Sequence, residues 1–227
     1  MERKKGVSRR DFIKLCVATA VGVLFKPENV QADNEYPYMA QPTWNTCGYA
    51  VMAMFAAQYK NEDVKSVYGR VKEYFEMIGK YDVTLGESAL KDYLERKEDV
   101  PVKSAEATWD LNLLQYQIEN FKSTIVCVTS NYGVEDSRKN PANHWVLFDN
   151  ISEVDGKAYA LVRDPLRSAE VYKTKKKLTQ DMIPAKNGSI YIPIEKFIFA
   201  TGINYLHRND GVGESQYKKI FSSGKIR

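Results

Sequence analysis

The stretch QPTWNTCGYAVMAMFAAQ, residues 41–58, places a cysteine-glycine pair directly before nine consecutive apolar residues. The run from Tyr49 to Ala57 is apolar on every side of a helix, which is typical of a helix that passes through the core. Cys47 then lies at the N-terminus of this helix, where a negative charge is favoured. Gln41 lies six residues before the cysteine. Two interpretations fit Cys47: a small core residue, or a nucleophile that needs a histidine partner.

Further helices are predicted in the first half of the chain. Residues 61–80 repeat apolar side chains at the helical period. Residues 84–99 read as a surface helix that starts near Thr84 or Ser88, and residues 108–121 as another with Asp110 as its cap. This half of the chain therefore predicts a helical layer around the apolar run.

The second half changes to the period of β-strands. Asp155-Gly156, between two runs rich in β-branched and aromatic residues, is a hairpin signal. Residues 193–206 fit a short helix followed by a final strand. Helices followed by an antiparallel sheet predict one α+β domain over residues 33–208, without an internal linker. The other predicted strands are residues 122–132, 143–154, 157–165 and 189–194.

The first 32 residues are set apart from the domain by their composition. A basic start that contains SRRDFIK, residues 8–14, precedes an apolar run from Leu15 to Phe25 and small residues up to Ala32. This order is typical of a signal peptide, and the paired arginines resemble the bacterial twin-arginine type. We expect export by the twin-arginine machinery, removal of the signal near Ala32, and a periplasmic or extracellular mature chain that is not embedded in the membrane. The alternative is a retained N-terminal anchor, for which the apolar run is short.

Without this segment the charge of the chain is balanced. The whole chain has 33 Lys/Arg and 29 Asp/Glu, and residues 1–32 hold seven and three of these, which leaves 26 of each. Clustered positive charge for nucleic acid is therefore not expected on the mature domain. The basic run 173–177 is interpreted as a solvated loop, and the polar residues 209–227 as a flexible tail.

Cysteine is rare in the mature chain. Cys16 belongs to the signal segment, so only Cys47 and Cys127 remain. Cys127 lies in an apolar predicted strand, where a free cysteine behaves as a small hydrophobic residue, and we expect no disulfide between the two. The chain has no C-x-x-C pair. We therefore expect no zinc or dithiol redox site, and no cofactor.

A reactive thiol needs help to ionise, because its ordinary pKa is about 8.5. Two histidines are available. His207 lies near the C-terminal end and is interpreted as a surface residue, whereas His144 begins an apolar predicted strand. We expect His144 to be the partner of Cys47. A side-chain amide from Gln41 and the backbone N–H of Cys47 are then candidate donors to an oxyanion.

These residues resemble a known family. Their order is similar to that of papain-like cysteine peptidases, and more narrowly of the bacterial peptidases that process double-glycine leaders. The resemblance implies a papain-like fold, with Cys47 as nucleophile, His144 as general base, Asp164 as its orienting acid and Gln41 as oxyanion donor. Trp44 and Trp145 flank the two reactive residues and are candidate walls of a cleft. The matching elements are Gln41, Cys47-Gly48-Tyr49-Ala50, His144-Trp145-Val146 and Asp164-Pro165.

Asp149 and Asn150 lie closer to His144 in sequence than Asp164 does. Five or six residues of continuous strand span roughly 16 to 20 Å, so neither residue is expected to reach the histidine. Asp164 returns on the next strand. A plain two-residue turn sets it opposite Leu147, on the face turned away from His144. We therefore expect a bulge or a wider loop in this hairpin, because one extra residue moves a side chain to the other face.

Three functions fit these patterns. The first is a hydrolase that cleaves peptide or amide bonds of a peptide or protein substrate through a thioacyl intermediate. The second is a transglutaminase-like transfer of the acyl group to an amine. The third is a papain-like domain that binds a partner without turnover.

Overall fold

The computed structural model describes residues 36–106, 123–129, 142–166, 182–185, 188–194, 196–197 and 201–208. The predicted signal peptide, the predicted helix at 108–121, the basic run 173–177 and the tail 209–227 lie outside these residues. The side chain of His207 also lies outside the description, although its backbone is part of a strand.

Three helices form the first half, as the sequence predicts. They are α2 (Cys47–Lys60), α3 (Val64–Met77) and α4 (Glu87–Arg96). In α2 every residue from Cys47 to Ala57 is buried, which confirms the helix expected in the core. The left-handed backbone of Asn61 ends α2, and the Asp63 carboxylate then caps α3 by accepting the Ser66 N–H at 2.8 Å.

The second half forms one antiparallel seven-stranded sheet with the order β1-β7-β2-β3-β4-β6-β5. The predicted strands and the predicted short helical segment, at residues 194, 196 and 197, are present. Two short strands, β1 and β5, are not among those predicted. The fold is therefore mixed α+β, as expected. The strands are β1 (Val102–Glu106), β2 (Thr124–Thr129), β3 (Ala142–Val154), β4 (Lys157–Arg163), β5 (Ile183–Pro184), β6 (Ser189–Pro193) and β7 (Thr201–Arg208).

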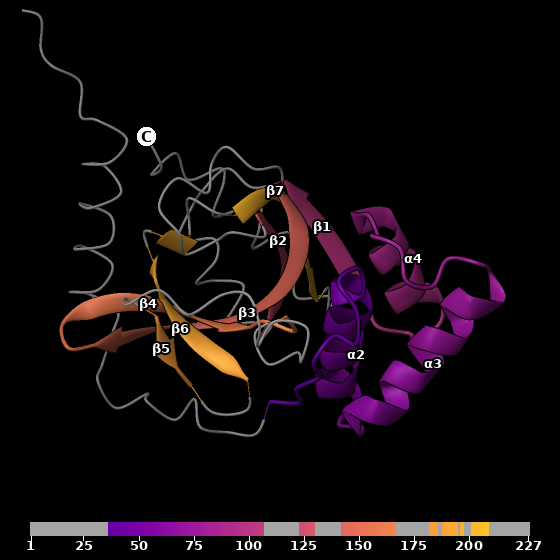
Figure 1. Cartoon of the computed structure of the whole chain (residues 1–227), viewed down its shortest axis with the longest axis horizontal. Helices are drawn as coiled ribbons and strands as arrows, with labels where there is room; N and C mark the ends of the chain where they lie inside the picture. The colour runs from indigo at the N-terminus through magenta and orange to yellow at the C-terminus, as the bar shows by residue number, and fades with distance from the viewer. Residues whose placement is uncertain are drawn as a thin grey trace, which may run out of the picture.

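The helices gather on one side of the curved sheet, and α2 packs against β3 (Figure 1). The shared core joins aromatic and aliphatic side chains of the helices to alternate residues of β2 and β3, including Ile125, Trp145 and Leu147. On the opposite face of β3, Phe148 stacks on Phe197 at 5.2 Å between ring centroids. The N-terminus of α2 thus lies beside the start of β3.

The β3–β4 hairpin has the predicted turn and, of the two expected irregularities, the bulge rather than the wider loop. Asp155 and Gly156 both have positive φ, at 50° and 73°, as a two-residue hairpin turn requires. The register then shifts between Phe148 and Asn150, which leaves Asp149 as the extra residue. This shift of one residue, smaller than the three needed to set Asp164 directly opposite His144, is sufficient.

The reason lies in the alternation of the strand. Beyond the bulge Arg163 pairs with Leu147, so both side chains lie on the helix-facing side of the sheet. The next residue, Asp164, therefore turns to the other face, which it shares with His144. Asp164 is one step diagonal to the histidine and lies within reach of it.

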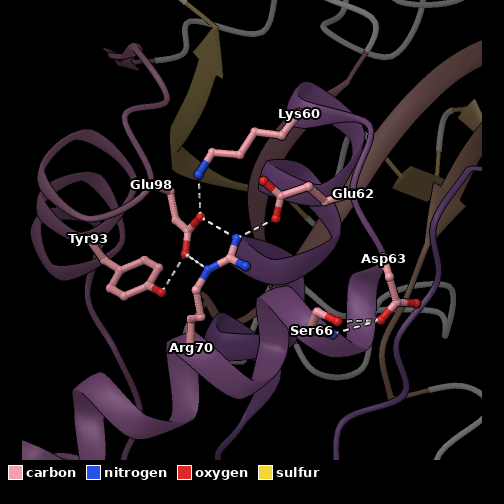
Figure 2. Close-up of polar contacts among 7 residues, drawn as sticks. All are labelled: Lys60, Glu62, Asp63, Ser66, Arg70, Tyr93 and Glu98. Carbon is pink, nitrogen blue, oxygen red and sulfur yellow. Dashed lines mark hydrogen bonds and ion pairs between the residues drawn. The ribbon is translucent and has the colours of Figure 1, made fainter.

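One buried acid, Glu98, makes hydrogen bonds to side chains of all three helices. Glu98, 1% exposed, accepts hydrogen bonds from Lys60 at 2.7 Å, from Tyr93 at 2.8 Å and from two nitrogens of Arg70 (Figure 2). Burial raises the pKa of Glu98, but its bonds to Arg70, Lys60 and Tyr93 outweigh burial and hold the pKa below its usual value. This ionised group fixes the ends of α2 and α4 against α3.

Candidate active site

Cys47 is the first residue of α2, and the local loop leaves the start of this helix uncapped. The Thr46 hydroxyl donates to the Thr43 carbonyl at 3.1 Å and makes no cap hydrogen bond. The backbone N–H groups in the first turn of α2 are thus free of a side-chain cap. The Gly48 N–H from this turn and the Trp145 N–H from β3 both donate to the Cys47 sulfur. The thiol is free and only 3% exposed.

His144 lies at the start of β3, where it bridges the thiol and a carboxylate. Its Nε2 is 2.7 Å from Asp164 Oδ1, and the ring also hydrogen-bonds the Cys47 sulfur. Because Nε2 faces the carboxylate, Nδ1 is the nitrogen left for the sulfur. Both partners of the histidine are buried, and His144 itself is 4% exposed. The structure therefore brings Cys47, His144 and Asp164 together in one line of contacts.

Asp164 follows the last residue of β4 and is fully buried. Its Oδ1 accepts the Leu166 N–H at 2.8 Å in addition to the histidine contact. Hydrogen bonds of this kind favour the ionised carboxylate. A buried negative charge directly behind the imidazole follows from this arrangement.

The pKa of the Cys47 thiol is lowered, whereas the pKa of the His144 imidazole is raised. Burial raises the pKa of Cys47, but the hydrogen bond and positive charge of His144 and the two backbone donors lower it more. Burial lowers the pKa of His144, but the Asp164 charge and the Cys47 contact raise it well above its ordinary value. A thiol with a lowered pKa beside an imidazole with a raised pKa favours the thiolate–imidazolium form.

Gln41 lies beside the same site but points its amide elsewhere. Its Nε2 donates to the Thr43 carbonyl at 2.6 Å and to the Trp44 carbonyl at 3.2 Å. Its buried Oε1 has no partner among the described residues. In this conformation Gln41 braces the loop that leads to Cys47. Donation of the Gln41 amide to an oxyanion stays a prediction, which requires the side chain to turn.

The two tryptophans differ in their surroundings. Trp145 is 4% exposed, packs in the core shared with the helices, and donates its indole N–H to the Leu85 carbonyl at 2.8 Å. Trp44 is 51% exposed on the loop before Cys47. Of the two, Trp44 is the one whose ring is available to line a cleft.

Asp149 has a different partner, as expected from its distance along the strand. Its carboxylate binds Arg163 through two contacts of 2.7 and 2.8 Å and accepts the Ser123 hydroxyl at 2.6 Å. Both charges are almost fully buried. Sequence reasoning did not identify this ion pair, although a charged residue inside the apolar strand 158–163 was the signal for it.

Cys127, the second thiol, lies on β2 opposite Trp145. It is also free, and burial, with the nearby Cys47 adding to it, raises the pKa of Cys127 to about 12. The expected absence of a disulfide thus holds for the two cysteines in this structure.

Metal-binding clusters and membrane-spanning helices are both absent from the described part of the chain. No group of three or more His, Cys, Asp or Glu side chains there is arranged to hold a metal ion. No helix there has the length and apolar content needed to cross a membrane.

Comparison with known protein families finds no matching family, and comparison with curated proteins finds no matching relative. The case for function therefore rests on the geometry of the site.

Proposed function

We propose that the chain is an exported thiol-dependent hydrolase with a papain-like arrangement, which cleaves peptide or amide bonds through Cys47, His144 and Asp164. The observation that carries this proposal is the position of His144, whose Nε2 is 2.7 Å from Asp164 Oδ1 while the ring hydrogen-bonds the Cys47 sulfur. A helical half that presents the thiol and an antiparallel half that presents the histidine and acid support it further.

In the proposed reaction the Cys47 thiolate attacks the substrate carbonyl carbon, and the carbonyl oxygen becomes an oxyanion. The backbone N–H groups at the uncapped start of α2 are suited to stabilise this charge, and Gln41 joins them once its side chain turns. The C–N bond then breaks as the His144 imidazolium gives its proton to the leaving amine. A thioester between Cys47 and the acyl group remains.

Deacylation completes the cycle. The now neutral His144 takes a proton from water, which attacks the thioester carbonyl and releases the carboxylic acid and the thiolate. Asp164 holds the imidazole in place and stabilises its positive charge in both steps. The site supplies both proton transfers without a metal or cofactor.

One observation favours a second candidate, a papain-like domain that binds a partner without turnover. Cys47 is 3% exposed, and the Gln41 amide is engaged with loop carbonyls rather than turned toward the sulfur. A thiol with so little exposed surface and no side-chain amide turned toward it is less suited to attack a large substrate.

Trapping of the acyl-enzyme distinguishes these candidates. The protein is incubated with a mixed peptide library, quenched with acid, and analysed by mass spectrometry for adducts on the two cysteines. We expect acyl adducts on Cys47, absent from the Cys47→Ala protein, together with peptides that end in a free carboxylate. An added primary amine that converts most product to amide would indicate acyl transfer instead. Absence of any adduct or product from an otherwise folded protein would contradict catalysis and favour the binding domain.

A further inference from the structure

Strand pairing sets the face on which Asp164 lies but does not extend to the residue itself. Strand β4 ends at Arg163, so the acid lies one residue beyond its ladders with β3 and β6. A residue outside a ladder needs other contacts to hold its backbone in place. These contacts come from residues 36–41, an extended segment that we name the N-terminal strap.

The strap holds three consecutive residues at the end of β4. The Tyr38 hydroxyl donates to the Asp164 carbonyl at 2.8 Å, and the Gln41 N–H donates to the Pro165 carbonyl at 2.9 Å. One residue earlier, Arg163 Nη1 donates to the carbonyl of Pro37 at 2.7 Å. The strap thus contacts the backbone of Asp164 and Pro165 and the side chain of Arg163.

Gly188 makes room for this contact. It precedes β6, whose first residue, Ser189, pairs with Arg163, so Gly188 lies level with Asp164 on the neighbouring strand. A Cβ atom built on Gly188 would lie 2.3 Å from the Tyr38 ring, a distance that real side chains do not adopt. The backbone φ of +71° at Gly188 also favours glycine. The ring of Tyr38 therefore occupies space that a side chain would fill.

We propose that Tyr38 and Gly188 are positioning residues for the catalytic acid: the tyrosine ring, seated on the glycine, holds the Asp164 backbone so that its carboxylate faces His144. This inference rests on the proposed function, because it assigns a role at the same site. It also gives the strap a role in the chemistry. The segment that follows the predicted signal peptide completes the active site from outside the sheet.

The experiment measures the alkylation rate of Cys47 by iodoacetamide against pH, in a Cys16→Ala, Cys127→Ala background so that one thiol reports. A thiolate–imidazolium pair gives a plateau between two inflections, the lower from Cys47 and the upper from His144. Displacement of Asp164 removes part of the negative charge that stabilises the protonated form of His144. The lower inflection then moves up and the upper one moves down, so the plateau narrows.

Tyr38→Phe keeps the ring and removes only the hydroxyl, and we expect it to narrow the plateau by about half a pH unit, the equivalent of a modest hydrogen bond. Gly188→Ala forces the ring away and is expected to narrow it by about one unit or more. Tyr74→Phe removes a hydroxyl from the aromatic cluster of α3, and Gly156→Ala adds a Cβ at a φ of +73° in open space. These controls are expected to keep the wild-type plateau.

The outcomes separate this inference from the function on which it rests. A wild-type profile with one inflection near the ordinary thiol pKa of about 8.5 contradicts the proposed function itself. A wild-type plateau that Tyr38→Phe leaves unchanged contradicts only the positioning role. Equal narrowing by Gly188→Ala and Gly156→Ala would assign the effect to backbone strain and remove Gly188 from the proposal. Loss of stability without a change of profile, read from thermal unfolding, would mean that the strap is structural.

Discussion

Cys47 and Cys127 are the same side chain in two different surroundings. Cys47 is the more buried of the two, yet its pKa is lowered, whereas burial raises the pKa of Cys127 to about 12. Burial acts in the same direction on both thiols. The difference lies in their partners, since Cys47 has a charged imidazole and Cys127 has none among the groups that affect its pKa.

The backbone explains why the partners differ. Cys47 begins α2, so the Gly48 N–H of the same helix donates to its sulfur. The N-terminal end of α2 meets the start of β3, where the Trp145 N–H and the His144 ring hydrogen-bond the same sulfur. Cys127 lies within a strand, where its backbone is committed to the ladder with β3. Exposure alone would therefore predict Cys127 to be the more reactive thiol, whereas the neighbouring groups predict Cys47.

The largest effect is expected when each thiol is removed in turn. Cys47→Ser should lower peptide hydrolysis by a factor on the order of 10⁴ or more, because the nucleophile is lost. Cys127→Ser should leave the rate within about twofold, since this side chain takes no part in the reaction. Initial rates on a fluorogenic peptide found by the library screen give the comparison. Equal losses in both variants would contradict the assignment of roles.

Removal of the imidazole should reduce the difference in reactivity between the two thiols. At about pH 6 an ordinary thiol is roughly 0.3% ionised, so His144→Ala should slow alkylation of Cys47 by about 10²-fold. Labelling of Cys127 stays slow in both proteins and serves as the internal control. Mass spectrometry of the two cysteine-containing peptides measures both rates in one sample. Fast labelling of Cys47 that persists in His144→Ala would place the cause in the helix terminus instead.

The charge behind the imidazole sets the upper pH limit of the pair. His144 has a raised pKa in the folded protein, so its positive charge is present at low pH and is lost as the pH rises through that pKa. Asp164→Asn keeps the shape and removes the charge, and should move the upper inflection of Cys47 alkylation down by about 1–3 pH units. Asp149→Asn, which removes the charge of another buried acid near β4, is the matched control. An upper inflection that does not move in Asp164→Asn would mean that the carboxylate has no electrostatic role.

A substitution in the cluster around Glu98 is expected to have the smallest effect on the difference in reactivity between the two thiols. Glu98→Gln removes a charge that Arg70 and Lys60 both contact, and should lower the free energy of unfolding by about 1–3 kcal/mol. The ratio of Cys47 to Cys127 labelling should not change, because no contact links this cluster to His144 among the described residues. Urea unfolding and labelling at low denaturant test the two halves of this prediction. A changed ratio would show that reactivity reflects global stability.

Much of the fold is encoded locally and was therefore predictable. The apolar run after Cys47 indicates a buried helix, and the turn at Asp155-Gly156 indicates the hairpin. The bulge followed from a conflict between that turn and the face that Asp164 must occupy. These inferences need only the period of a strand or helix and the chemistry of a turn.

Other features depend on partners far away in the sequence. Strand β1 is short and acquires its structure by pairing with β7, about a hundred residues later. The Arg163–Asp149 pair and the Glu98 cluster likewise join groups whose partners no local pattern identifies. The contact between the strap and Asp164 belongs to the same class, since Tyr38 and the acid are 126 residues apart. Local sequence indicates that such residues are unusual but not what they bind.

The central claim is that Cys47 is a thiolate held by a protonated His144. The ultraviolet absorbance of the thiolate, followed during a pH titration of the Cys16→Ala, Cys127→Ala protein, measures this directly. We expect the Cys47 thiolate to form well below the ordinary pKa of about 8.5, and to form near that value once His144→Ala is added. A thiolate that forms at or above about 8.5 in the protein with His144 intact would contradict the account.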